Sequence, residues 1–280
     1  MDAEEQEPRP ERGTGREGGP GPARPAVLAG VLIVALGVVA AVVLTGNTGG
    51  HSDHGPAAGL SGLSARGASP FRAGDAGTVV LDGVSGSVQV TADPDADTVS
   101  GSFHRQDGTS APLQGTMSTA GDGAGPGGRT LTVRCLDDDG PAPCAGTLRL
   151  TVPEHTALRM RQTSGSTVID GLGGDLDLDA ASLQLTVRGL RSPHADVNVV
   201  SGSADLGFAD APADLDLHAS SASVAVRLPQ VDGGYAVTTA AASANVRVGV
   251  PRASGAAHRV ALTVTSGSLS VQNACAGGRR

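Results

Sequence analysis

The sequence has no lysine, no tryptophan and very few aromatic residues. Of its 280 residues only three are Phe and one is Tyr, whereas 42 are Gly. Large rings normally fill the centre of a globular domain, because each of them buries a large area. A core made from Val, Leu, Ile and Ala is better suited to a thin, stacked architecture than to a globule.

The common signatures of catalysis are also missing. A chain without Lys has no Walker-type phosphate loop, and we find no G-x-S-x-G, H-E-x-x-H or C-x-x-C pattern and no dinucleotide-binding fingerprint. The net charge of −8 argues against nucleic acid, which needs a basic surface. We therefore expect a protein that is not an enzyme and has no cofactor.

One long apolar run, Ala26 to Leu44, predicts a transmembrane helix over residues 26–45. At about 1.5 Å per residue it spans close to ~30 Å, the thickness of a bilayer core. Arg residues precede this run and the next Arg is Arg66, so the positive-inside rule predicts a cytoplasmic N-terminus in the cell membrane and an extracytoplasmic C-terminal domain. The alternative is a cleaved signal peptide.

Composition divides the rest of the chain. The acidic, Arg- and Pro-rich start predicts a disordered cytoplasmic tail, and a Gly/Ala/Ser-rich stretch predicts a flexible linker. The predicted segments are residues 1–25 (tail), 26–45 (transmembrane helix), 46–77 (linker), 78–273 (extracytoplasmic β domain) and 274–280 (C-terminal tail).

The β domain repeats. A Ser-containing corner recurs about every 20 residues, and the third and fifth positions after it are nearly always aliphatic, with polar residues between them. An earlier copy starts at Ser85. The predicted corners are Ser164, Ser182, Ser201, Ser221, Ala241 and Ser266, and the fifth positions are Ile169, Val187, Leu206, Val226, Val246 and Val271.

This pattern predicts an all-β fold in which two short strands and a tight turn form one unit. A single unit cannot bury its apolar side, but units stacked ~4.8 Å apart can. We expect a β-solenoid, or one-sided β-helix, of short stacked strands in which the fifth positions form a column. The alternative is a β-sandwich of many short strands.

The three cysteines are Cys135, Cys144 and Cys275. The first two bracket a short loop between predicted strands at 130–134 and 147–152. If those strands form a hairpin, the two cysteines face each other, and outside the cytoplasm they are expected to form a disulfide. Cys275 is left over, either as a free thiol or as an intermolecular link.

Two charged patterns recur on the predicted outer faces. Acidic side chains on first strands would repel one another, and either solvent or a Ca²⁺ ion could relieve this; these residues are Asp175, Asp177, Asp214 and Asp216. Arg188, Arg227 and Arg247 recur in one outward slot of the second strands, which predicts an interaction face for anionic wall polymer or a partner protein.

The chain from about Thr130 to Gln272 resembles the bacterial putative-adhesin family of β-strand-repeat proteins (DUF4097). The resemblance is carried by the sequence around Cys135, Cys144 and Pro153, and by the corners at Ser164, Ser201 and Ser266. It implies a one-sided β-helix exposed on the cell envelope, and it implies no ligand.

We therefore expect a non-enzymatic envelope surface protein, an adhesin or interaction scaffold held by a single-pass anchor. The alternative is an extracytoplasmic sensor or regulatory subunit. A carbohydrate-cleaving enzyme is a third hypothesis, but it needs paired carboxylates across a groove.

Overall fold

The computed structural model describes residues 69–274, apart from 75, 107–112, 120–127, 138–139 and 142–143. These residues belong to one compact unit, residues 53–280. Within them the chain forms strands and no helix, so the all-β prediction is confirmed. The described part therefore holds no helix that is long and apolar enough to span a membrane; the predicted transmembrane segment, 26–45, lies outside it.

The strands fall into two groups by length. The first eight have 2 to 10 residues, and the last six have 14 to 16. Their bounds are β1 Ser69–Gly74, β2 Thr78–Asp82, β3 Val84–Asp93, β4 Thr98–Arg105, β5 Leu113–Thr119, β6 Arg129–Asp137, β7 Gly140–Pro141, β8 Cys144–Pro153, β9 Ala157–Asp170, β10 Leu176–Leu190, β11 His194–Phe208, β12 Asp214–Leu228, β13 Tyr235–Val248 and β14 His258–Asn273.

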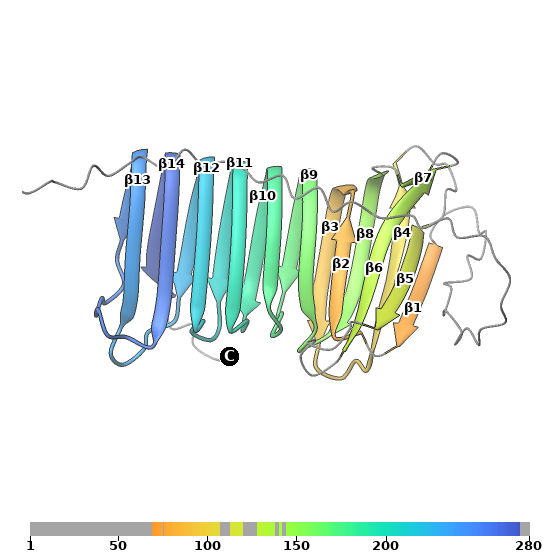
Figure 1. The fold of residues 1–280 in the computed structure, drawn as a ribbon, viewed down its shortest axis with the longest axis horizontal. Coiled ribbons are helices and arrows are strands. Elements are labelled where there is room, and N and C mark those ends of the chain that lie inside the picture. The colour runs from red at the N-terminus through yellow and green to blue at the C-terminus, as the bar shows by residue number, and fades with distance from the viewer. Residues whose placement is uncertain are drawn as a thin grey trace, which may run out of the picture. The chain divides into compact units, whose positions relative to one another are not determined.

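The long strands are parallel and in register. Figure 1 shows them side by side in the order β9, β10, β11, β12, β14, β13. Each pairs residue by residue with its neighbours, so equivalent positions of the repeat lie next to one another. The serines at the corner mark this alignment, and we call them the corner serines: Ser164, Ser182, Ser201, Ser221, Ser266 and Ser243.

The predicted column of aliphatic side chains is present, with one correction. Its members are Ile169, Val187, Leu206, Val226, Val271 and Val248. The prediction of Val246 was wrong, because the corner of β13 is Ser243 and not Ala241. The run of Ala residues before Ser243 repeats too weakly to fix the register from sequence. The earlier copy is confirmed, since Val90 pairs with Ile169.

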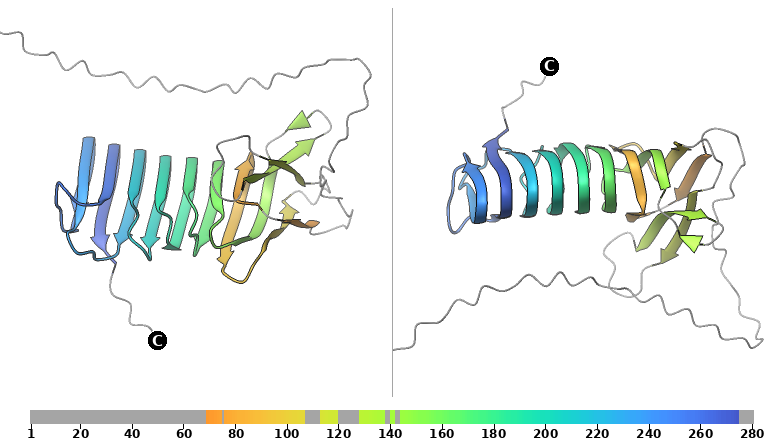
Figure 2. Two further views of the ribbon diagram at one scale, coloured as in Figure 1. Left: turned by 60° about the horizontal axis from the view of Figure 1, so that its bottom comes forward. Right: turned by 90° about the horizontal axis from the view of Figure 1, so that it is seen from above.

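Each long strand folds back on itself at its corner. The 15 residues of β10 would reach ~50 Å if straight. The connection Arg191–Pro193 spans at most about 15 Å, and β11 runs parallel beside β10, so the end of β10 must lie near its start. We call the residues before the corner serine the first arm and those after it the second arm. The curved ribbons in the right-hand view of Figure 2 show this path.

The core lies between the two arms. On β10 the buried positions before the corner are Leu176, Leu178 and Ala180, and the first three after it are Leu183, Leu185 and Val187. The buried set switches from even to odd numbers at the corner, so both arms turn their apolar sides inward. The prediction of two short strands and a turn is thus replaced by one strand with a bend.

The bend depends on close approach between neighbouring backbones. Gly202 has a φ of +109°, and a Cβ atom there would lie 2.1 Å from the carbonyl oxygen of Leu183. Gly165, on the other side of Leu183, has a φ of +126° and the same kind of contact with Gly86. Across the six long strands, glycine alternates with larger residues at the corner: Gly165, Leu183, Gly202, Ala222, Gly267 and Ala244.

The last two strands exchange places. β14 lies between β12 and β13, so β13 is the end of the sheet (Figure 1). The connection between them bridges the start of β13, where Arg252 pairs with Tyr235. Tyr235 is fully buried and donates a hydrogen bond to the Pro229 carbonyl at 2.7 Å.

At the other end, pairs of shorter strands replace the long ones. β2 pairs with the first arm of β9 and β3 with its second arm, and next to them β6 pairs with β2 and β8 with β3. The predicted hairpin of 130–134 with 147–152 is wrong, because β6 and β8 pair in parallel with two different strands. Cys135 follows the partner of Asp82, and Cys144 pairs with Val84. Both cysteines thus lie at the β6–β8 corner; the side chains of this pair lie outside the described part.

Two segments outside the repeat pattern contain strands. Residues 69–74 of the predicted linker form β1, which is antiparallel to β4. Residues 113–119, where the sequence shows no aliphatic alternation, form β5, which is antiparallel to β6. Neither strand has the aliphatic alternation on which the predictions depended.

Candidate interaction surface

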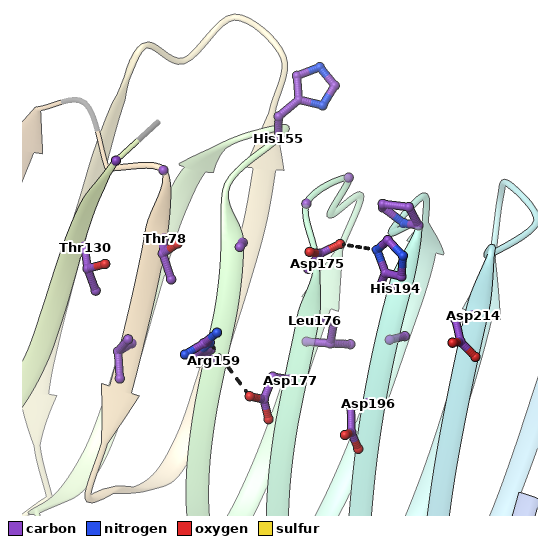
Figure 3. A pocket seen from close by; sticks show the side chains of 18 of the residues that line it. Thr78, Thr130, His155, Arg159, Asp175, Leu176, Asp177, His194, Asp196 and Asp214 are labelled. Carbon is purple, nitrogen blue, oxygen red and sulfur yellow. Dashed lines mark hydrogen bonds and ion pairs between the residues drawn. The ribbon is translucent and has the colours of Figure 1, made fainter. Parts of the chain in front are cut away.

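The outer side of the first arms is acidic and hollowed. A depression of about 960 Å³ extends from β6 and β2 across β9, β10 and β11 to β12. Figure 3 shows Asp177 and Asp196 in it, with Asp175 and His194 near its rim. Asp177, Asp196 and Asp216 lie on adjacent strands in one row, which we call the acidic row. The acidic side chains thus recur on the outer side of the first arms, as predicted.

Charges on this face are largely compensated between strands. Arg159 on β9 lies 3.8 Å from Asp177, and Arg161 lies 3.4 Å from Asp179. Arg259 on β14 pairs with Asp214, and His194 Nδ1 lies 3.1 Å from Asp175 Oδ1. These groups are mostly exposed, so each pair contributes little to stability. Their effect is to limit repulsion between stacked acids.

Asp196 is the exception in the acidic row. Burial raises the pKa of its carboxyl group, and the charges of Asp216 and Asp177 raise it further, while His218 opposes them. Asp196 lies between two acidic strands, whereas Asp177 has Arg159 on one side. The middle of the row therefore carries the uncompensated negative charge.

The predicted Ca²⁺ ligands do not come together. Asp177 and Asp216 lie on β10 and β12, with β11 between them, so their backbones are ~9.6 Å apart. Ca²⁺ needs several oxygens at about 2.3–2.6 Å. In the part of the chain that the structure describes, no group of three or more His, Cys, Asp or Glu is placed to hold a metal ion.

The three Arg residues of the predicted interaction face do not form one stripe. Arg188 and Arg227 each directly follow a member of the aliphatic column, Val187 and Val226, but Arg247 pairs with Ser270 and precedes Val248. The register error at Ser243 explains this difference. Arg227 donates hydrogen bonds to both carboxylate oxygens of Asp205, at 2.5 and 3.0 Å, and Arg188 lies 3.9 Å from Asp170.

The outer side of the second arms carries a further pattern that was not predicted from the sequence. An unbroken row of uncharged polar side chains crosses eight strands on the second-arm side, and we call it the polar ladder. Its members are Thr147, Ser87, Ser166, Gln184, Ser203, Ser223, Ser268 and Asn245. The signal was the polar residue two positions after each corner serine.

The polar ladder forms one wall of a shallow groove. The groove has a volume of about 410 Å³ and crosses β10, β11, β12 and β14. Gln184, Ser203, Ser223 and Ser268 line it and are exposed. Ser268 donates a hydrogen bond to the Ser223 hydroxyl at 3.3 Å, so hydroxyl groups on neighbouring strands are close enough to contact one ligand together.

The buried polar groups have structural roles. Gln162 donates hydrogen bonds to the carbonyls of Gly86 and Ser164, both at 3.1 Å, and accepts one from Thr167. Ser192 donates to the Gly174 carbonyl. These bonds join neighbouring strands at the corner and at the connections. They use the polar groups of these side chains within the fold, so the side chains are not placed to bind a ligand.

Comparison with known proteins gives little. No family model matches the chain, so the resemblance to DUF4097 is not confirmed. No curated protein matches it either. Among solved structures it is similar to a "putative cell adhesion protein" from Clostridium sporogenes ATCC 15579, with a TM-score of 0.44 and 8% identity over 74% of this chain and 100% of that one. A likeness at that level establishes neither a fold nor a function.

Proposed function

We propose that this chain is a non-enzymatic envelope surface protein whose β-solenoid binds an extended polymer along its outer face. The observation that carries the proposal is the polar ladder, which offers one uncharged polar group per strand across eight strands. Strands in a sheet repeat every ~4.8 Å. A linear, neutral, hydroxyl-rich polymer such as a wall polysaccharide can meet several of these groups at once.

Three features support binding rather than catalysis. The depression on the first arms is open, and its acids are mostly paired with Arg or His. The groove beside the polar ladder is shallow and contains one carboxylate, Asp205, which is bound by Arg227. The repeated units present many weak contacts instead of one enclosed site, which suits multivalent binding.

The placement in the cell belongs to the same proposal. Residues 26–45 would anchor the chain in the membrane, and residues 46–68 would hold the β domain outside it. An extracytoplasmic sensor would use the same anchor, with envelope polymer as its signal.

The test is co-sedimentation of the purified full chain with wall polysaccharide, with and without Ca²⁺. We expect binding that Ca²⁺ does not change and that a ladder variant (Ser203→Asp, Ser223→Asp, Ser268→Asp) loses. A matched control adds three acids to the outer side of the first arms (Asn198→Asp, Ala261→Asp, Thr263→Asp) and should still bind. Equal binding by the ladder variant would show that the ladder is not the site. Release of reducing sugars by the wild-type chain would show an enzyme.

A further inference from the structure

The end of the sheet at β13 is built differently from the rest of the molecule. On β10, β11 and β12 the outer side of the first arm carries the acidic row. The same row continues to Ala261 on β14 and Thr238 on β13. A neighbouring row ends in Thr263 and Ala240. Acidic side chains therefore stop two strands before the end of the sheet.

Within the residues that the structure describes, the free edge of β13 has unpaired backbone groups. The Tyr235 N–H donates to the Pro251 carbonyl at 2.9 Å, and its carbonyl accepts from Ala253 at 3.0 Å, so both groups of Tyr235 face away from β14. Backbone groups of alternate residues in a parallel strand face the same edge. Those of Val237 and Thr239 therefore face outward as well, beyond the short segment that covers Tyr235.

The core is also open at this end. Val237, Val246 and Val248 are only partly buried, whereas their partners on β14, Val260, Leu269 and Val271, are at most 1% exposed. Stacked repeats need a cap where the stack ends. Natural edge strands are usually protected by charges, Pro or bulges. Among the residues of β13 the only charged one is Arg247, and none is Pro.

We propose that a second copy of this chain covers this end, so that β13 pairs with the β13 of the other copy. In a two-fold dimer the β13 edge of one copy faces the β13 edge of the other, and the two strands run antiparallel. The partly exposed Val side chains at the end of each core are then covered by the other copy. Because the facing rows are Ala and Thr, two chains with a net charge of −8 can approach here without opposed carboxylates.

In the described part of the chain, the segment 251–253 bonds only to Tyr235, at the start of this edge. The described part ends beside β12, where the Ala274 N–H donates to the Leu228 carbonyl. The strand β1 lies at the opposite end of the strand order, ~43 Å away along the sheet. That opposite end begins with a six-residue strand containing Pro70 and Arg72, which protect it from pairing.

The experiment measures the mass of the purified full chain, in neutral detergent, by sedimentation over a concentration series. We expect a dimer that Thr239→Lys weakens at least about tenfold, because the ammonium group lies on the open end. Thr186→Lys, on the outer side of β10, is the matched control and should still dimerise. A monomeric wild-type chain, or a Thr239→Lys variant that dimerises as well as the control, overturns the proposal; the latter result would place the contact elsewhere, for example in residues 26–45.

A second measurement needs no variant and therefore does not depend on whether Thr239→Lys folds. Amide hydrogen exchange is followed in the wild-type chain as its concentration rises. We expect exchange at Val237 and Thr239 to slow, while exchange at Tyr235, which is already bonded to Pro251, stays constant. Exchange at Val237 and Thr239 that does not depend on concentration overturns the proposal.

Discussion

Gly202 lies in register with Leu183 on the neighbouring strand, at a distance that leaves no room for a side chain. Its φ of +109° adds a backbone conformation that L residues rarely adopt. We therefore expect Gly202→Ala to lower the free energy of unfolding by about 3 kcal/mol, measured by denaturant titration.

Gly255→Ala is the control for this change. Gly255 has open space around the position of a Cβ atom, so this substitution should change the free energy of unfolding by less than about 0.5 kcal/mol. If the two variants were equally stable, the backbones would not approach at the corner as described.

The aliphatic column predicts a large effect at its centre. Leu206 is fully buried between Val187 and Val226. Leu206→Ala should cost about 3 kcal/mol, through lost burial and the cavity left behind. Val200 is 47% exposed, and Val200→Ala should cost less than about 0.5 kcal/mol. Similar thermal stability of the two variants would contradict a core between the two arms.

Asp196 predicts a pH dependence with a definite sign. Because the pKa of Asp196 is raised in the folded chain, ionisation of its carboxyl group disfavours folding. The free energy of unfolding therefore has its full value below the ordinary pKa of 3.8 and falls as the pH rises through the raised pKa. Asp196→Asn cannot ionise, so it should raise the melting temperature at pH 7 and leave it unchanged well below pH 3.8. Asp210→Asn, outside the acidic row, is the control; an equal gain from it would point to net charge alone.

The Arg227–Asp205 pair predicts a small coupling. Both side chains are about half exposed (51% and 40%), so solvent weakens their attraction. A double-mutant cycle with Arg227→Gln and Asp205→Asn should give about 0.5 kcal/mol, declining with added salt. A coupling of several kcal/mol would mean that the pair is shielded from water.

The placement of Cys135 and Cys144 at one corner keeps their disulfide as a prediction. Peptide mapping without reductant should recover the two cysteines in one linked peptide pair. Reduction should then lower the stability of the wild-type chain by about 2–3 kcal/mol and leave a Cys135→Ser, Cys144→Ser variant unaffected. Free thiols at both positions in protein from an oxidising compartment would exclude the bond.

The strongly periodic units could be predicted from the sequence, because aliphatic alternation within a 20-residue repeat specifies both the strands and their register. This holds for Ile169, Val187, Leu206 and Val226, which align as expected. It fails at β13, where consecutive Ala residues fit two registers and only packing against β14 selects Ser243 as the corner.

The exchange of β13 and β14 could not be read from the chain at all. Each strand fits next to β12 by pattern, and the structure places β14 there, with Tyr235 and the connection after β13 at the end of the sheet. The surface residues were predictable to the same extent. Alternation alone identified the acidic residues, but the ion pairs between strands and the polar ladder depend on the register. The predicted Arg stripe was wrong because the register of β13 was wrong.

An experimental structure of the chain tests the central claim most directly, because the surface exists only if the strands stack in register. We expect the side chains of Ile169, Val187, Leu206, Val226 and Val271 in one buried column, with Ser203, Ser223 and Ser268 side by side on the outer face. Aliphatic side chains dispersed among antiparallel strands, with these serines far apart, would contradict both the fold and the binding surface.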